Sequence, residues 1–440
     1  SLLLFSTTIN YMDRQVISYL KEFFCTPADK GGFGWTNSDF ANVTASFTAF
    51  YAVMTIFAGM LIDKIGTKMG LALALIIWSV FGMANALAGQ AIIMHVIIRS
   101  LFGIGEAGNF PASIKTVAEW FPKKERALAT GVFNSGSNLG AMISALLVPW
   151  LLIQFGDANG WKMAYIITGA FGFIWLIFWF WLYDSPSNHK KLSKAEYDYI
   201  HSDEDASAAN NDTKKVSWGK LLTYRQTWSF FFGKFMTDGV WWFYLFWLPD
   251  YLKKQFGMSK HEVMLPTFIV YGVAIIGSVY GGAIPLKFMN KGWNVYKARM
   301  TAMILIAFFP LTILSAQYLS NKELFGDMAS VFAVAVICIA AAAHQAWSAN
   351  IFTTVSDMFP KKAVASVTGI GAAAGGLGGV IVQKLAGGLT DHFIATPQTA
   401  YLIMFFICAF SYIAAWLIMK ALVPKLSLIH ISEPTRRTPI

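Results

Sequence analysis

The sequence predicts an all-α membrane protein with twelve membrane-spanning helices in two pseudo-symmetric six-helix bundles. Three observations predict this fold: the composition, a series of long apolar stretches, and a repeat between the two halves of the chain. Hydrophobic residues make up 56% of the 440 residues and charged residues only 13%, and the mean hydropathy is +0.52. This composition is typical of a polytopic protein whose solvent is mostly lipid.

Twelve apolar stretches approach or exceed the length of about 20 residues that a helix needs to cross a bilayer. They lie near residues 2–20, 42–62, 70–88, 92–116, 127–153, 162–183, 228–252, 264–286, 298–319, 328–353, 363–387 and 400–422. One long polar interval divides them into six and six. We therefore expect an N-terminal bundle at 1–184, a central loop at 185–226 and a C-terminal bundle at 227–425.

The two ends of the sequence do not fit this pattern. Residues 426–440 resemble a translated adaptor sequence, and we expect a non-native tail there, with a disordered native tail as the alternative. Ser1 stands where a Met is expected, directly before the first apolar stretch. We therefore expect that a short native N-terminus is missing.

The basic residues predict how the chain is oriented. One set of loops holds most of them, and the alternate loops hold fewer. The basic set includes Lys64, Lys68, Lys123, Lys124, Arg126, the central loop, the segment 287–299, Lys361 and Lys362. By the positive-inside rule this side is cytoplasmic, and both termini lie there because the number of spans is even.

A repeat relates the two halves. The segment Glu119–Lys124 reads Glu-Trp-Phe-Pro-Lys-Lys, and Asp357–Lys362 reads Asp-Met-Phe-Pro-Lys-Lys. The following Thr-Gly and Leu-Gly pairs keep the same offset, which places His344 opposite Glu106. Two like-oriented halves are typical of transporters built from parallel repeats.

The sequence does not indicate a disulfide framework or a metal, nucleotide, hydrolase or nucleic-acid site. Cys25, Cys338 and Cys408 are an odd number without metal-ligand spacing, so we expect no disulfide framework and no metal site. The glycine run 369–379 lacks the strand–turn–helix setting of a nucleotide-binding loop, and no familiar hydrolase motif occurs. The net charge of +10 is spread in short clusters between apolar runs, so no nucleic-acid partner is expected.

The loop after the second stretch carries a recognisable motif. The run Gly59-x-Leu61-x-Asp63-Lys64-x-Gly66-x-Lys68 resembles the loop motif of the major facilitator superfamily, with Lys64 in place of the usual Arg. The resemblance implies a gating latch between helices at Asp63, Lys64 and Gly66. It also implies the fold of twelve helices in two like halves.

Narrower motifs resemble a subfamily. Tyr11–Arg14, Arg99–Pro111 and the segment from Trp120 to Arg126 resemble the anion:cation symporter family, which moves organic anions with protons or sodium. Trp241–Tyr251 and Ala343–Asp357 resemble bacterial hexuronate transporters, which implies glucuronate or galacturonate as substrate.

Four charged residues within the first and fourth stretches are the main candidates for function. A charge at membrane depth costs at least about 2.5–3.5 kcal/mol on insertion scales, so it needs a reason. We expect Arg14 to bind the substrate carboxylate as a bidentate fork, with a structural ion pair to the other half as the alternative. Asp13 and Glu106 are the expected proton carriers. Arg99, on the face of Glu106 two turns away, is its expected partner, in a contact that changes between the outward-open and inward-open states. The alternative is a permanent salt bridge that only shapes the helix.

Further candidates are polar and aromatic side chains that suit a sugar acid. The expected substrate-binding residues besides Arg14 are Tyr11, Tyr51, Asn134, Asn138, His344, Gln345, Trp347, Ser348 and Asn350. Helical spacing prevents the last four from all facing inward; it favours a face with His344 and Trp347, which Ser348 or Ile351 could join. Lys234 is expected to snorkel to the cytoplasmic interface.

Taken together, we expect a monomeric symporter in the bacterial inner membrane. It would import a hexuronate anion with protons by alternating access, with sodium as the alternative coupling ion and no other cofactor. The alternatives are a carrier of aldonates, aldarates or other organic anions and, more remotely, a polytopic membrane enzyme.

Overall fold

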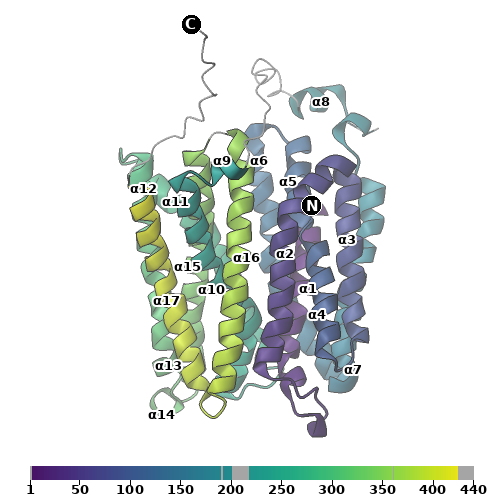
Figure 1. Ribbon diagram of the computed structural model, residues 1–440, viewed down its shortest axis with the longest axis vertical. Coiled ribbons are helices and arrows are strands. Elements are labelled where there is room, and N and C mark those ends of the chain that lie inside the picture. Colours follow the sequence, from purple (N-terminus) through teal and green to yellow (C-terminus); the bar gives the residue numbers. More distant parts are fainter. Residues whose placement is uncertain (1, 190–191, 201–217, 360, 425–440) are drawn as a thin grey trace.

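A computed structural model describes residues 2–189, 192–200, 218–359 and 361–424, which are helical without a β-strand in these ranges (Figure 1). The predicted tail at 426–440 and much of the predicted central loop therefore lie outside the described residues. The remaining elements can be matched to the twelve apolar stretches.

The first six spans are formed by seven helices. These are α1 (Leu2–Cys25), α2 (Asn37–Ile65), α3 (Thr67–Ala84), α4 (Ile92–Glu106), α5 (Asn109–Trp120), α6 (Lys123–Asn134) and α7 (Gly136–Leu182). The fourth span is α4 with α5, and the fifth is α6 with the first part of α7. Gly156, with φ 68°, kinks α7 and separates the fifth span from the sixth.

The last six spans follow a stretch with two short helices, α8 (Lys194–Ile200) and α9 (Trp218–Leu221). They are α10 (Arg225–Phe256), α11 (Met264–Met289), α12 (Val295–Phe308) continuing through a 3₁₀ segment into α13 (Ala316–Leu319), α15 (Met328–Met358), α16 (Lys361–His392) and α17 (Pro397–Leu422). The short α14 (Lys322–Phe325) precedes α15. In Figure 1, α1 begins and α17 ends near the same end of the molecule.

Length and composition alone identify eight candidate membrane-spanning segments in the described residues. One of them, 129–182, contains both the fifth and the sixth span. The criterion misses α1 and α10, because mid-helix charges lower their hydropathy, and it misses the fourth span because the helix breaks after Glu106. The exceptions are thus the helices that carry the candidate site.

Glycines allow the fourth span to pack closely on its neighbours. A β-carbon on Gly105 would come within 2.5 Å of the Trp78 backbone nitrogen on α3, and one on Gly103 within 2.7 Å of the Phe47 carbonyl oxygen on α2. Close approach of this kind is characteristic of small residues in membrane helix interfaces. It places the end of α4, and with it Glu106, inside the bundle.

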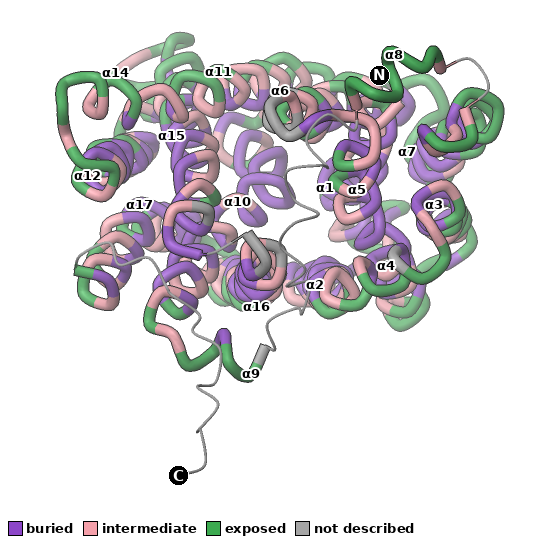
Figure 2. The backbone as a smooth tube through the Cα atoms, turned by 90° about the horizontal axis from the view of Figure 1, so that it is seen from above, coloured by how far each residue is buried: buried purple, intermediate pink, exposed green. Residues whose placement is uncertain are grey.

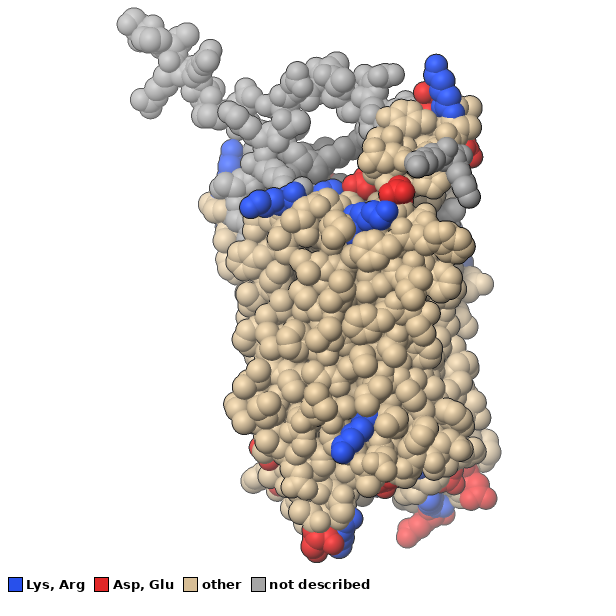
Figure 3. All heavy atoms as spheres, turned by 90° about the vertical axis from the view of Figure 1, so that its right-hand side faces the viewer, with Lys and Arg blue, Asp and Glu red and all other residues tan. Residues whose placement is uncertain are grey.

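Seen from above, α1–α7 lie on one side of the molecule and α10–α17 on the other (Figure 2). The main contacts between the two groups are made by α2 with α16, α7 with α11, and α1 with α10. Large apolar side chains such as Ile177, Trp181 and Val279 are exposed on the perimeter. Figure 3 shows one face on which charged side chains gather near the two ends, with a largely uncharged band between them. This band is the surface that a bilayer would cover.

Two adjacent glycines on α11 test the helix packing. A β-carbon on Gly281 would come within 2.2 Å of the Ala346 β-carbon on α15, whereas one on Gly282 meets nothing within 4 Å. Gly281→Ala should therefore lower the free energy of unfolding by about 1–3 kcal/mol through overpacking. Gly282→Ala should leave it unchanged or raise it by up to about 1 kcal/mol, because Ala favours helix. Thermal unfolding of the purified protein in detergent measures both, and equal effects would contradict the packing of α11 on α15.

Candidate functional site

The centre of the candidate site is an ion pair between α1 and α4. Both Nε and Nη2 of Arg14 contact one carboxylate oxygen of Glu106, Oε2, at 2.8 and 2.7 Å. The two side chains are 2% and 0% exposed. The other oxygen of Glu106, Oε1, has no hydrogen-bond partner in the part of the chain that the structure describes. Arg14 therefore binds one oxygen of the Glu106 carboxylate, and the other oxygen could accept a further hydrogen bond.

Aromatic rings enclose the guanidinium of Arg14. Its Cζ lies 4.3 Å from the ring centre of Tyr11, 4.7 Å from Tyr51, 5.4 Å from Phe47 and 5.1 Å from Trp242. Such contacts stabilise a cation by about 0.5–2 kcal/mol each. Trp242 belongs to α10 and the other three rings to α1 and α2. We call these four rings the aromatic cage; it places Arg14 where the two groups of helices meet.

Arg99 does not form the ion pair that the sequence suggested. Two helical turns, about 10 Å of rise, separate it from Glu106 on the same face, while Arg14 reaches Glu106 directly from α1. Arg99 instead donates through Nη2 to the Arg14 carbonyl oxygen at 3.3 Å and lies over the rings of Phe47 and Phe102. Its Nε and Nη1 have no hydrogen-bond partner among the described residues. Arg99 is thus a second buried cation next to the pair.

Asp13 is buried beside this pair in the chain but contacts neither arginine through a hydrogen bond. Asp13 is 2% exposed, and neither of its carboxylate oxygens has a hydrogen-bond partner among the described residues. An ionised carboxylate in such a setting is costly. Asp13 is therefore suited to hold a proton.

Of the residues predicted on the tenth span, His344 contacts α10 and α17. Its Nδ1 lies 2.7 Å from the Tyr412 hydroxyl, and its ring stacks on Trp241 with 4.9 Å between centres. Trp347 is fully buried against Tyr412, and Asn350 donates to the carbonyl oxygens of Gly281 and Ala346. Trp347 and Asn350 thus face the interior of the α10–α17 group and are not brought to Arg14.

The remaining predicted residues are dispersed. Tyr11 and Tyr51 lie in the aromatic cage. Asn138 is 5% exposed with its Oδ1 unpartnered among the described residues, whereas Asn134 is exposed, and Gln345 and Ser348 are half-buried.

For the predicted latch, Gly66 adopts a φ of 85° between α2 and α3, and Lys64 is exposed. The side chain of Asp63 lies outside the described part of the chain.

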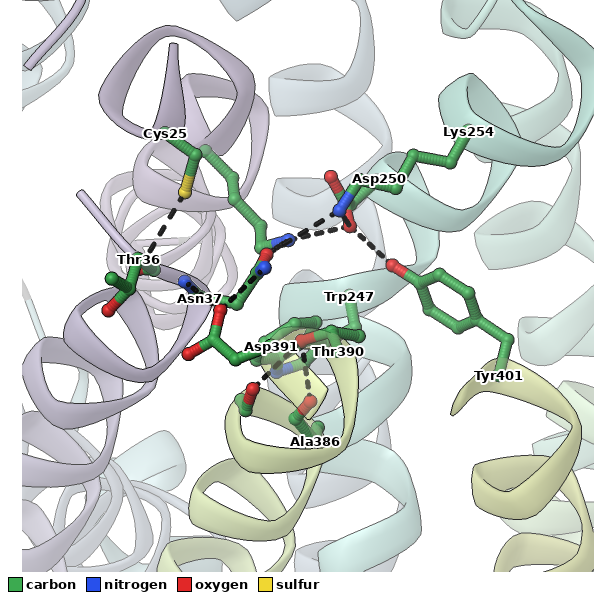
Figure 4. Close-up of polar contacts among 12 residues, drawn as sticks. Cys25, Thr36, Asn37, Trp247, Asp250, Lys254, Ala386, Thr390, Asp391 and Tyr401 are labelled. Carbon is green, nitrogen blue, oxygen red and sulfur yellow. Dashed lines mark hydrogen bonds and ion pairs between the residues drawn. The ribbon is translucent and has the colours of Figure 1, made fainter. Parts of the chain in front are cut away.

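Sequence reasoning missed a buried network at one end of the molecule (Figure 4). Lys21 on α1 donates to Asp250 on α10 at 2.6 Å and to Asn37 on α2 at 2.8 Å. The same oxygen of Asp250 lies 3.1 Å from Lys254 and accepts a hydrogen bond from Tyr401. The sequence shows Lys21 and Asp250 as charged residues near the ends of two apolar stretches. No sequence pattern indicates that these two residues pair.

A second contact at this end joins α2 to α16. The carboxylate of Asp391 accepts from the Asn37 and Ser38 backbone N–H groups at 2.8 and 2.7 Å and from the Asn37 side chain at 2.9 Å. These are free donors of a helix N-terminus, which favours a negative charge. Three further contacts cross between the helix groups near this end: Lys253–Glu22 at 2.7 Å, Lys384–Asn42 and Lys260–Asp157. We call this set, with the Lys21 network, the end clamp.

A comparison with known families decides the classification. A profile of the Major Facilitator Superfamily matches residues 3–383. The chain belongs to this superfamily. It is therefore a multi-pass membrane transporter and not an enzyme, and the twelve-helix, two-bundle fold predicted from the sequence is confirmed.

Relatives within the superfamily agree with the resemblance seen in the sequence. The Hexuronate transporter of Escherichia coli K12 is 30% identical over 407 residues, which cover 92% of this chain and 90% of that protein. The Galacturonate transporter of Dickeya chrysanthemi is 31% identical over 64% of this chain and 79% of that protein. The D-galactonate transporter of Escherichia coli O6:H1 is 28% identical over 84% of each.

A solved structure shares the fold. The crystal structure of a D-xylose-proton symporter superposes with a TM-score of 0.72 at 16% identity and covers 97% of this chain and 98% of that one.

If transport by this superfamily member requires the end clamp to open, cross-linking it should stop transport. The double variant Asn42→Cys/Lys384→Cys places thiols on α2 and α16, and a short bifunctional thiol reagent should reduce uptake in proteoliposomes to background. Cys25→Ser removes the one half-buried native thiol; the other two are buried.

The matched control is Gln317→Cys/Gln398→Cys, which lies within the α10–α17 group, where the Gln317 side chain donates to the Gln398 carbonyl oxygen at 3.3 Å. Its uptake before and after cross-linking should agree. Full uptake with the 42–384 cross-link in place would show that the clamp does not need to open.

Proposed function

We propose that this chain imports a hexuronate anion together with protons by alternating access. The observation that carries the proposal is the buried Arg14–Glu106 pair inside the aromatic cage, at the junction of the two helix groups. The similarity to hexuronate and galacturonate transporters supports the choice of cargo.

The chemistry follows from the Arg14 fork. A guanidinium presents parallel N–H groups that match a carboxylate, which a Lys ammonium does not reproduce. Here that fork is filled by Glu106. A cargo carboxylate needs the same donors, so it competes with Glu106. Protonation of Glu106 removes its charge and frees Arg14 for the cargo, which links proton binding to cargo binding.

Asp13 supplies a second place for a proton. It adjoins Arg14 in the chain, is buried, and has no hydrogen-bond partner among the described residues. A proton on Asp13 would lower the cost of moving this part of α1 through a conformational change.

We propose that the end clamp closes the periplasmic side. Lys64 lies in the last turn of α2 and Lys68 in the first turn of α3. Both are therefore at the opposite end of α2 from Asn37, where the clamp lies. The positive-inside rule then makes that opposite side cytoplasmic, with both chain termini. The protein would act as a monomer in the bacterial inner membrane, and rocking of the two helix groups would break the clamp to admit cargo.

A related cargo is the second candidate. The D-galactonate transporter is 28% identical, and a Probable galactarate/D-glucarate transporter of Escherichia coli K12 is 27% identical over 88% of this chain. These sugar acids also offer a carboxylate for Arg14. Uptake of glucuronate, galacturonate, galactonate and glucarate by the purified protein, compared at equal concentration, separates the candidates.

The pair of charges predicts distinct transport defects. Arg14→Ala should lower glucuronate uptake into proteoliposomes by about 100-fold or more, since removing a hydrogen-bonded buried charge partner costs about 3–5 kcal/mol. Arg14→Lys should also lower uptake, because an ammonium keeps the charge but not the paired N–H donors. Glu106→Gln should abolish accumulation driven by a pH gradient but keep exchange of labelled for unlabelled cargo. Lys194→Gln removes an exposed positive charge on α8 and should behave like the unaltered protein. Accumulation by Glu106→Gln under a pH gradient would remove Glu106 from the coupling scheme.

The coupling ion is tested separately. Uptake should respond to an imposed pH gradient in sodium-free buffer and should fall to equilibration when a protonophore collapses that gradient. Uptake that instead requires a sodium gradient and survives the protonophore would establish sodium as the coupling ion.

A further inference from the structure

A second buried ion pair lies near the middle of α10 and has no part in the scheme above. Lys234 Nζ is 2.8 Å from Asp238 Oδ2, and the two side chains are 6% and 21% exposed. Lys234 also lies 4.2 Å from the ring centre of Phe352. Lys234 therefore does not snorkel to the interface as the sequence suggested. It is held inside the protein by an acid one turn away.

This pair shares a helix face with the aromatic cage. Lys234, Asp238 and Trp242 follow each other at intervals of four residues, so their side chains project from one side of α10. Trp242 covers the Arg14 guanidinium at 5.1 Å. The four residues from Asp238 to Trp242 correspond to about 6 Å of helix rise. Asp238 thus lies about one turn from the cage, which is a separation that a six-carbon sugar acid can bridge.

The neighbouring helices place Asp238 at a crossing point. A β-carbon on Gly375 of α16 would come within 2.2 Å of Asp238 Oδ2, and one on the next residue, Gly376, within 2.2 Å of the Ala52 β-carbon on α2. The carboxylate therefore lies beside the contact between α16 and α2, which belong to different helix groups. The same contact places Tyr51, next to Ala52, at Arg14.

Asp238 is 21% exposed although other helices surround its helix. The helix α10 packs against α1, α15, α16 and α17, and Figure 2 shows it inside the ring of helices. Most side chains of α10 in the membrane-spanning part are buried, Trp242 among them. Asp238 is therefore partly accessible on a helix whose other side chains are mostly covered.

A structural ion pair is a poor explanation for these residues. Burying an ion pair adds little stability compared with apolar residues of similar volume, and a mid-membrane charge is costly. Lys234 occupies only one oxygen of Asp238. A carboxylate with a free oxygen accepts hydrogen bonds from hydroxyl groups, and an ammonium beside it donates to them. The pair is suited to a neutral polyhydroxylated group.

We propose that Lys234 and Asp238 form the second half of the cargo site and bind the hydroxyl-bearing end of a sugar acid whose carboxylate lies on Arg14. This inference rests on the proposed function and deepens it. It assigns selectivity to α10: a sugar acid of about six carbons contacts both Arg14 and Asp238, whereas a two-carbon hydroxy acid contacts Arg14 alone.

The test compares a long and a short acid on the purified full-length protein. The measurement is the concentration of glucuronate, galacturonate or glycolate that gives half of the maximal increase in melting temperature. It is made for the unaltered protein, Asp238→Asn and Lys234→Met/Asp238→Asn. The double variant leaves no buried charge unpaired, so it keeps the test valid if the single variant does not fold. Asp327→Asn, an exposed aspartate before α15, is the matched control.

Both α10 variants should lower the affinity for the two hexuronates by about tenfold or more, which is the effect of losing hydrogen bonds to a charged group. They should change the affinity for glycolate by less than about twofold. Asp327→Asn should change neither. Equal effects on all three acids, or no effect of Asp238→Asn on hexuronate binding, would overturn the assignment. If the unaltered protein is stabilised by neither hexuronate, the proposed cargo itself fails, and this inference fails with it.

Discussion

The structure depends on one buried contact, the ion pair between Arg14 on α1 and Glu106 on α4. Neither charge would be stable alone at membrane depth. Together they join the first span to the fourth, and the aromatic cage around Arg14 extends the contact to Trp242 on the opposite group of helices. In the proposed mechanism a cargo carboxylate would need the donors that Glu106 uses, so the same contact would oppose cargo binding until Glu106 is protonated.

The helices α1 and α10 carry most of the buried candidate charges. Lys21 and Arg14 lie on α1, and Asp238, Trp242 and Asp250 lie on α10. The Lys21–Asp250 contact closes one end, while Arg14 and Trp242 meet nearer the middle. A change in the relative position of α1 and α10 would therefore act on the end clamp and on the cage at once. Under the proposed function, this arrangement would couple the site to alternating access.

The sequence predicted the helices and the candidate charges well because hydropathy and the cost of buried charge act locally. Arg14, Glu106, Tyr11 and Tyr51 were all identified, and the structure brings them together. The pairing was not predictable in the same way. Helical spacing placed Arg99 on the face of Glu106, but the closer partner comes from another helix, 92 residues away in the chain.

Contacts between residues far apart in the chain could not be predicted from the sequence either. The repeat places His344 opposite Glu106, yet His344 pairs with Tyr412 and Trp241 inside its own group, so sequence symmetry did not carry over to chemistry. Trp347 was favoured as a partner on the same face but packs against Tyr412. Asp391 reaches the start of α2 from 354 residues away, a contact that depends on how two helices pack.

The central claim is that Arg14 binds either Glu106 or the cargo carboxylate, and that a proton decides between them. The most direct measurement is the number of protons taken up when glucuronate binds the purified protein, obtained by calorimetry in buffers of different ionisation enthalpy at one pH. The account predicts uptake of roughly one proton per cargo molecule near neutral pH, since Glu106 must be protonated when it is displaced. Tight binding with no proton uptake, at any pH between 6 and 8 (about the range in which a coupling carboxylate would have to act), would contradict it.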